Sequence, residues 1–305
     1  MKQFIIVLTA LLLSTTSYAQ FEISASGGYA IGSAGMKIGE IQTTSGTENT
    51  YGSYGEGLNA QLRGTYFFND RFGADLSLGY LHGSDQTVSK VRFDGYEVDA
   101  IARARAFGAS ASLVYRFNTN VYSRIGALVK LGGKTEAVVR QKATFSQAEA
   151  DAFGVPFGSY TETNYVEDYH GQFPLGFVAA IGYRHQLNTN FSIFVEAEYY
   201  GISLKRKDSE ITEFNTNVIL PDGTVAVSGL YSLDNLPEGT NRTTTYVDEL
   251  SSDNTDTSKE LAVKVPYSSF GINFGVIYKF KRSHTNRNLT WYHNLCHFTP
   301  IKFKY

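Results

Sequence analysis

The sequence lacks features on which several classes of protein depend. Its 305 residues contain one cysteine, which excludes an intrachain disulfide framework and a cysteine-cluster metal site. The 27 basic and 29 acidic residues nearly balance, and this removes the general case for nucleic-acid binding, which needs a basic face. Charged residues make up only 18% of the chain, less than a soluble globular protein usually carries. In contrast, the chain holds 29 Gly, 21 Tyr and 21 Phe.

The start of the chain predicts export from the cytoplasm. Lys2 precedes an apolar run over 4–13, and residues 14–19 end in the small-residue pattern Ser-Tyr-Ala. Together these parts form a secretory signal peptide, and the run is too short for a transmembrane helix of about 20 residues. We therefore expect residues 1–19 to be removed. The longest mostly apolar stretch after them, 173–183, is broken by Pro and Gly and is also too short to span as a helix.

Eight later segments alternate apolar and polar residues. In one of them Phe107, Leu113 and Tyr115 share one parity, while Ser110 and Arg116 take the other. A period of two predicts a β-strand with one apolar and one polar face. The pattern recurs over 21–31, 58–68, 72–80, 107–117, 121–131, 175–183, 191–199 and 270–280. These segments have the length of tilted membrane-spanning strands.

The connections between these segments are of two kinds. Three are short Asn-rich turns at 69–71, 118–120 and 188–190, for which we expect left-handed backbone because Asn and Asp tolerate it. Four are long, at about 33–57, 83–103, 134–172 and 205–265. Short turns at one end and long loops at the other are typical of outer-membrane barrels. An even number of strands then places both termini at the short-turn end, in the periplasm.

The predicted fold is all-β: an eight-stranded antiparallel up-and-down transmembrane β-barrel over residues 20–280, with long extracellular loops. It would lie in the outer membrane of a Gram-negative cell with its apolar face toward lipid, since a closed barrel pairs its backbone groups without an exposed edge. A barrel of ten strands is the alternative if 135–142 or 224–231 adds hairpins, although strand extensions above the membrane would give the same pattern.

The polar face carries charges of both signs. A lumen charge network is expected near the periplasmic end, formed by Arg63, Asp75, Arg116, Arg124, Arg184, Glu196 and Glu198. The lumen of an eight-stranded barrel is narrow enough for side chains to fill. We interpret the network as a salt-bridged plug, and a narrow ion or proton path is the other interpretation.

Basic residues also cluster where the strands should leave the outer leaflet, namely Arg103, Arg105, Lys205, Arg206 and Lys207. Such a rim could pair with lipopolysaccharide phosphates, and ordinary snorkelling charges are the alternative.

The acidic stretch 208–260 is interpreted as a solvated mobile loop or as a surface that captures a ligand. Asp253, Asp256 and Glu260 lack the order of a calcium-binding loop, so we expect no metal there.

The stretch over 270–280, with the sequence FGINFGVIYKF, resembles the closing strand of the small outer-membrane β-barrel proteins of the OmpA-transmembrane, OmpX and OmpW type. The resemblance covers about residues 21–280. It implies that the barrel assembly machinery reads this strand, with Tyr278 and Phe280 at the carried-over positions. The chain departs from the family pattern because residues 281–305 follow the strand.

This tail has five basic residues and no acidic one, and we expect it to be disordered or to make a periplasmic contact. Its His293, Cys296 and His297 lack the second ligand pair that a structural zinc site needs.

Catalysis is not expected. His82 and His170 lie near the predicted rim, close in sequence to Ser84, Asp85 and Asp168, but no fixed-spacing motif supports a Ser-His-acid arrangement. We predict no catalytic residue and no cofactor.

The expected protein is a monomer whose partners are outer-membrane lipid, lipopolysaccharide, the assembly machinery and an unknown surface ligand. Its predicted role is structural or surface interaction through the loops, and a narrow channel or transporter for small or hydrophobic solutes is the alternative.

Overall fold

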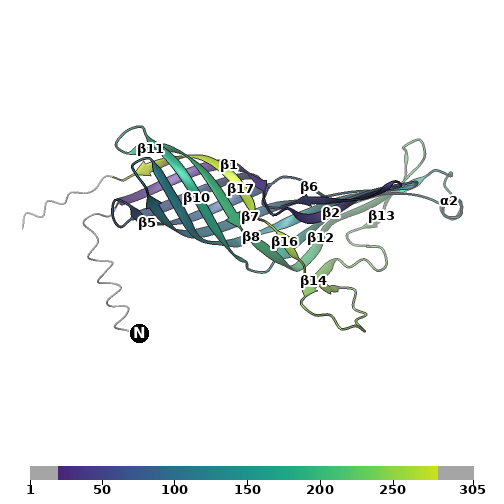
Figure 1. Ribbon diagram of the computed structural model, residues 1–305. Helices are drawn as coiled ribbons and strands as arrows, with labels where there is room; N and C mark the ends of the chain where they lie inside the picture. Colours follow the sequence, from purple (N-terminus) through teal and green to yellow (C-terminus); the bar gives the residue numbers. More distant parts are fainter. Residues whose placement is uncertain (1–19, 281–305) are drawn as a thin grey trace, which may run out of the picture.

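The computed structural model describes residues 20–280 and shows one continuous, almost entirely β-structured sheet (Figure 1). A barrel occupies one end of the molecule, and a narrower sheet, here called the extension, projects from the barrel (Figure 1). The predicted signal peptide at 1–19 and the predicted tail at 281–305 lie outside the described residues.

Eight antiparallel strands close the barrel. In ring order they are β1 (Gln20–Gly32), β4 (Gly57–Phe67), β5 (Phe72–Gly83), β7 (Tyr96–Arg116), β8 (Val121–Thr144), β10 (Leu175–Gln186), β11 (Phe191–Gly201) and β17 (Ser269–Lys279). The last strand pairs with the first from Glu22↔Lys279 to Gly32↔Ser269, so the ring has no open edge. The predicted eight-stranded barrel is confirmed.

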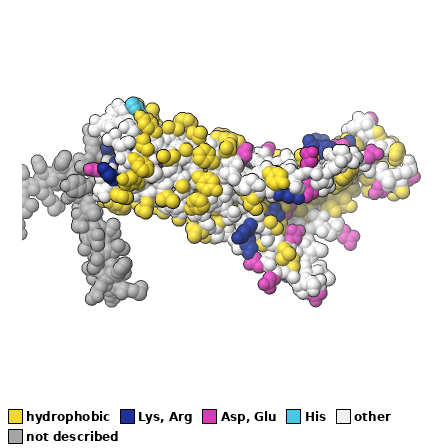
Figure 2. All heavy atoms as spheres, in the orientation of Figure 1, with side chains coloured by type: hydrophobic (Ala, Val, Ile, Leu, Met, Phe, Trp, Pro, Cys, Tyr) yellow, Lys and Arg dark blue, Asp and Glu magenta, His cyan; other side chains and the backbone are white. Residues whose placement is uncertain are grey.

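The two faces of the barrel point as the alternation predicts. Leu76 and Ile125 on the outside are 70% and 62% exposed, whereas Arg124 and Glu196 on the inside are 2% and 0% exposed. Figure 2 shows hydrophobic side chains spread over the barrel wall and charged side chains gathered mostly on the extension. Because every strand of the ring is paired on both sides, this apolar wall can lie against hydrocarbon.

Asn residues close the three short turns, but not through the backbone conformation that the sequence predicts. Asn69 Oδ1 accepts hydrogen bonds from the backbone N–H groups of Arg71 and Phe72, at 2.9 and 2.7 Å. Asn118 and Asn188 make the same two bonds to the residues two and three positions on. Among the described residues only glycines have positive φ, so the expected left-handed Asn is wrong. The side-chain amide instead takes the place of a backbone acceptor.

The long connections build the extension. β7 and β8 run past the ring and stay paired as far as Tyr96↔Ala143. The other strands of this sheet are β2 (Met36–Thr43), β3 (Gly46–Gly52), β6 (Gln86–Phe93), β9 (Tyr160–Gly171), β12 (Ser203–Ile219) and β13 (Val225–Ser232). They pair in the order β3-β2-β6-β7-β8-β9-β12-β13, in which β2 and β6 are parallel.

Two sequence interpretations change as a result. The segment 135–142 is a continuation of β8, and 224–231 falls largely in β13, so both belong to the extension and neither adds a strand to the ring. The acidic stretch 208–260 is not simply a solvated loop, because it contains most of β12, all of β13 and β14 (Thr243–Val247), and the start of β15 (Lys259–Leu261). The short strand β16 (Lys264–Pro266) then pairs with the base of β12 before the chain re-enters the barrel.

A short helix, α2 (Gln147–Phe153), lies near the far tip of the extension (Figure 1). It begins with a capping box between Ser146 and Glu149 and ends at Gly154, which is left-handed with φ 64°. Ala150 of this helix packs in a small buried cluster with Phe145 and Val218. Within residues 20–280, no helix is long and apolar enough to cross a membrane.

Candidate functional site

Glu196 is the centre of a buried charge cluster in the lumen. Its carboxylate accepts a bidentate pair of hydrogen bonds from Arg63, at 3.0 and 3.1 Å, and further bonds from Arg124 Nη2 at 3.0 Å and Nε at 3.2 Å. The Tyr122 hydroxyl donates a hydrogen bond of 2.8 Å to the same carboxylate. β4, β8 and β11 supply these residues, so the cluster ties together strands from around the ring.

Glu198 extends the cluster toward the long-loop end. It pairs with Arg124, and it accepts hydrogen bonds from Gln61 Nε2 at 2.7 Å and Asn273 Nδ2 at 2.6 Å. Asp75 stands at the edge, because its only ion pair with a described residue is a long one of 3.9 Å to Arg63. The central cluster therefore contains two guanidinium groups and three carboxylates, all of them buried.

A second tier closes the short-turn end. Glu22 accepts hydrogen bonds from Arg116 Nη2 at 2.7 Å and from Arg184 Nη1 at 2.9 and 3.1 Å. The Arg116 guanidinium also lies 3.3 Å from the centre of the Phe67 ring. The predicted network contains Arg116 and Arg184 together with the carboxylates of the central cluster, and it does not contain Glu22. The sequence signal that could have identified Glu22 is its position on the polar face of β1, where it alternates with apolar residues.

The tiers leave little space between them. The cavity there measures about 30 Å³ and is lined by residues of both tiers, among them Glu22, Arg63, Asp75 and Arg116. A cavity needs about 10–15 Å³ to hold one water molecule, so this space accommodates one or two waters and no larger solute.

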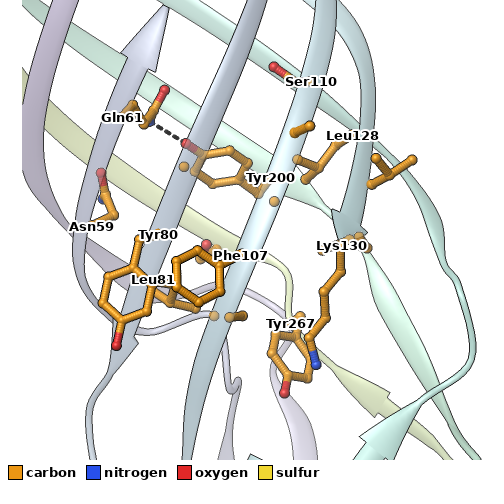
Figure 3. A pocket seen from close by; sticks show the side chains of 18 of the residues that line it. Asn59, Gln61, Tyr80, Leu81, Phe107, Ser110, Leu128, Lys130, Tyr200 and Tyr267 are labelled. Atoms are coloured by element: carbon orange, nitrogen blue, oxygen red, sulfur yellow. Dashed lines mark hydrogen bonds between the residues drawn. The ribbon is translucent and has the colours of Figure 1, made fainter. Parts of the chain in front are cut away.

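Above the central cluster the lumen widens into a mostly apolar cavity of about 110 Å³ (Figure 3). Gln61 and Tyr200, which are hydrogen-bonded to each other, lie on its wall together with Leu81 and Leu128. At the long-loop end this cavity is covered by a buried cluster that contains Tyr54, Leu204 and Tyr267, and the two tyrosine rings lie 5.8 Å apart. The lumen is thus filled at both ends.

The predicted basic rim is placed where the barrel meets the extension, and most of its charges have protein partners. Arg103 pairs with Glu136 at 3.0 Å, Lys205 with Asp248, and Lys207 with Asp208 at 3.1 Å. Arg105 donates to the carbonyl oxygens of Gly83 and Ala104. Arg206 differs from these residues, because its guanidinium lies over the Tyr169 and Tyr246 rings, at 4.5 and 5.6 Å.

Ion pairs at the rim shift the pKa values of its carboxylates. Burial alone would raise the pKa of Glu136, but hydrogen bonds from Lys134 and Arg103 lower it below 4.5. Burial would also raise the pKa of Asp208, but hydrogen bonds from Lys207 and His170 outweigh this effect and lower the pKa below 3.8. These carboxylates are therefore held in their charged form near neutral pH.

Three of the residues considered for catalysis contact groups outside the considered set. His170 Nδ1 lies 2.8 Å from Asp208 Oδ1, whereas Ser84 Oγ lies 3.1 Å from the Tyr29 hydroxyl. The His82 ring packs beside Tyr80. Among residues 20–280 no group of three or more His, Cys, Asp or Glu side chains could hold a metal ion. His293, Cys296 and His297 lie outside this range.

A family model for the outer membrane protein beta-barrel domain matches residues 6–220, more than two thirds of the chain. The chain belongs to this family. The protein is therefore an outer-membrane β-barrel, in agreement with the closed ring and its apolar wall. A search of curated proteins finds no match.

Several solved barrels resemble this family member. A major outer membrane protein from Thermus thermophilus is 10% identical, with 86% of this chain and 99% of that chain covered and a TM-score of 0.37. Neisserial surface protein A is 13% identical, with 86% and 99% covered and a TM-score of 0.30. Ail, the attachment invasion locus protein of Yersinia pestis, is 11% identical, with 86% and 97% covered and a TM-score of 0.29. Similarities this low carry no argument about function.

The predicted assembly residues of this family member lie at the short-turn end of β17. Tyr278 packs its ring against Phe191 at 5.1 Å and against Phe280 at 4.9 Å. The Phe280 N–H donates to the Phe21 carbonyl oxygen at 3.1 Å, which brings the ends of the first and last strands together. Tyr278 and Phe280 are 38% and 43% exposed on the outer wall. Their recognition by assembly machinery stays a prediction.

Proposed function

We propose that this protein is a non-catalytic surface-interaction protein of the outer membrane, which presents the extension to the cell exterior. The observation that carries the proposal is the fold of the long connections. They form one sheet continuous with the barrel through β7 and β8, and this sheet is longer than closure of the ring requires. A rigid sheet held away from the membrane offers a partner a fixed surface at little ordering cost.

The edges of the extension are the parts best suited to contact. β3 and β13 each lie at an end of the strand order, and Val225 and Val227 on β13 are exposed by 50% and 39%. An edge strand presents unpaired backbone N–H and C=O groups, to which an extended segment of a partner can add. We take the partner to be a protein.

The test uses a trimmed variant in which an Asn-Gly turn replaces residues 216–231. Asn215 and Ser232 are paired in the sheet, so a two-residue turn can join them. We expect cells that produce the wild-type protein to adhere to some members of a panel of immobilised proteins, and cells that produce the trimmed variant to adhere less. Equal adhesion of wild-type, trimmed and empty-vector cells contradicts the proposal.

The proposed orientation places the short turns and both termini in the periplasm. It is supported by the contrast between the short Asn turns and the long extension. In a Cys296→Ser background, a membrane-impermeant maleimide added to intact cells should label Asp222→Cys at the β12–β13 turn but not Thr119→Cys at a short turn. The reverse labelling would overturn the orientation.

The lumen is proposed to be a plug rather than a path. The two tiers and the buried tyrosines leave cavities of about 30 and 110 Å³ in the lumen, of which the smaller lies between the tiers. Planar-bilayer recordings of the purified protein should therefore show no large, steady single-channel currents, and liposomes should not swell in small sugars. Steady currents would favour the alternative, a narrow channel for small solutes.

Lipopolysaccharide is the proposed lipid partner of the rim. Lys207 supports this because its side chain is 65% exposed, and its only ion pair within residues 20–280 is with the neighbouring Asp208. We expect Lys205→Gln/Lys207→Gln to reduce the lipopolysaccharide that co-purifies with the protein. Lys90→Gln is the matched control, since Lys90 is exposed on β6 in the extension. Equal co-purification for wild type and the rim variant would exclude this contact.

A further inference from the structure

A cavity of about 100 Å³ lies where the barrel opens into the extension, and is here called the mouth cavity. Its walls come from strands of both parts, including β8 of the ring and β9 and β12 of the extension. The polar lining side chains include Lys130, Thr135, Tyr169, Arg206 and Tyr267. None of the described Asp or Glu residues lines it. The mouth cavity therefore gathers donors and positive charge without a carboxylate to accept them.

Arg206 is the first of two cations in the mouth cavity that form no ion pair with a described residue. Lys205 and Lys207, on either side of it, pair with Asp248 and Asp208, whereas Arg206 forms no ion pair with any described residue. Its guanidinium instead stacks on Tyr169 at 4.5 Å, on the same cavity wall. Stacking holds the plane of the guanidinium and leaves its edge, with the N–H groups, free to donate.

Lys130 is the second. Its ammonium lies 5.4 Å from the centre of the Tyr267 ring, and no carboxylate within the described chain pairs with it. Figure 3 shows the Lys130 side chain extending from the lumen wall to the Tyr267 ring, at the boundary between the lumen cavity and the mouth cavity. The third basic side chain on the wall, His170, lies with its Nδ1 atom 2.8 Å from Asp208 Oδ1.

Both side chains are half-buried, and charged groups that are partly removed from water in proteins are normally paired. We propose that the mouth cavity is a binding site for one small oxyanion, a carboxylate, sulfate or phosphate group, held between Arg206 and Lys130. Arg206 would bind two of its oxygens through parallel N–H bonds, and Lys130 would act as a point charge on the third side. The hydroxyls of Thr135 and Tyr267, hydrogen-bonded to each other, line the same wall.

The size of the cavity sets the class of ligand. About 100 Å³ admits a group of a few heavy atoms but neither a lipopolysaccharide headgroup nor a folded peptide. The ligand is therefore a small solute, and its capture is independent of the surface contacts proposed for the extension and for the rim.

Isothermal titration calorimetry on the full-length chain, refolded in detergent without lipopolysaccharide, tests the site. Sodium sulfate, phosphate and acetate are titrated separately, with chloride holding the ionic strength constant. We expect saturable binding of at least one of them at a single site. Because a hydrogen bond to a charged group contributes about 1.5–3 kcal/mol, Arg206→Gln and Lys130→Met should each weaken binding by about tenfold or more.

Lys90→Gln is the matched control, since Lys90 is exposed on β6 and does not line the mouth cavity. It should bind the anion as the wild type does, and a heat-modifiable band on gels should show that each variant is folded. The absence of saturable binding for all three anions overturns the proposal. So does unchanged binding in folded Arg206→Gln, or an equal loss in Lys90→Gln. Displacement of the bound anion by added lipopolysaccharide would show that the group is carried by lipid, contrary to the small-solute assignment.

Discussion

At the scale of single residues, the lumen is organised around a shared acceptor. Glu196 receives hydrogen bonds from both Arg63 and Arg124. The carboxylate of Asp75 is buried but has no hydrogen-bond partner among the described residues, and it lies 3.9 Å from Arg63. Asp75 cannot therefore replace Glu196 without a rearrangement of the cluster. A buried guanidinium that loses its carboxylate keeps its desolvation penalty and loses the compensating attraction.

Glu196→Gln should consequently destabilise the folded barrel by about 3–5 kcal/mol, because it leaves two buried guanidinium groups short of one negative charge. Urea unfolding in lipid vesicles, followed by circular dichroism, measures the change in unfolding free energy. The control is Glu210→Gln, since Glu210 pairs with Arg242 on the surface and its side chain is 43% exposed. A pair of that kind contributes about 0–1 kcal/mol. Equal effects in the two variants would contradict the assigned role of the cluster.

The contribution of Glu136 to stability depends on pH. Its pKa is lowered in the folded protein, so its contribution to stability is fully present above 4.5 and disappears as the pH falls through the folded value. We expect Glu136→Gln to lower the unfolding free energy by about 1 kcal/mol at pH 7. The difference from wild type should shrink as the pH falls below 4.5. Urea titrations at pH 7 and at acidic pH check this, and a difference that grows on acidification would reverse the sign of the argument.

The lumen also shows how far single residues can be predicted from this sequence. Alternation places Arg116, Arg184 and Glu196 on the polar face, and all three do face inward. Alternation does not give the height of a residue along the barrel axis, which depends on the stagger between strands. The sequence therefore could not show that Arg116 and Arg184 meet Glu22 rather than Glu196, or that the network divides into two tiers.

At the scale of elements, the β7–β8 pair decides how the extension joins the barrel. Its ladder is interrupted once, where Phe107 pairs with Gly132 and Gly108 with Lys130, so that Leu131 is bulged out. Such a bulge bends the strand and increases its twist. Immediately after it, Gly133 has φ +95°, and a Cβ atom there would lie 1.9 Å from the Arg105 carbonyl oxygen. Glycine is thus required at the junction.

Gly133→Ala should destabilise this junction by about 1–3 kcal/mol, since it combines an unfavourable backbone conformation with a backbone clash. The adjacent Gly132→Ala is the control, because its Cβ would meet nothing within 4 Å. We expect the control to be neutral or stabilising by about 0.4–1 kcal/mol through the unfolded state. Urea unfolding of both variants measures the difference, and a destabilisation of the same size in Gly132→Ala would remove the special status of Gly133.

The eight barrel strands were predictable because each alternates over a full membrane span, whereas the strands of the extension were not. Ala100, Ala102 and Ala104 continue the buried face of β7 beyond the ring, but the small apolar area of an alanine side chain gives only a weak alternation of hydrophobicity. The parallel pairing of β2 with β6 joins segments from two different connections, and no local pattern marks it. Only the possibility of strand extensions above the membrane was visible in the sequence.

At the scale of the whole molecule, the barrel and the tip of the extension depend on different contacts. Every pair of the ring lies among β1, β4, β5, β7, β8, β10, β11 and β17, and the apolar cluster at the tip is built by Phe145, Ala150 and Val218 instead. Between them lies the cluster of Tyr54, Leu204 and Tyr267 at the mouth. Removal of the tip should therefore leave both the ring and the mouth intact.

The trimmed variant, with Asn-Gly in place of residues 216–231, tests this independence. It removes Val218 and all of β13 except Ser232, so α2 should become more accessible to proteases, while the urea midpoint of the barrel should stay close to that of wild type. The deleted residues take part in no strand pairing of the ring, so their loss should lower the stability of the tip and not that of the barrel. A barrel that fails to fold without this hairpin would mean that the extension takes part in closing the ring. The adhesion difference expected for this variant would then have to be attributed to loss of the protein rather than to loss of an edge strand.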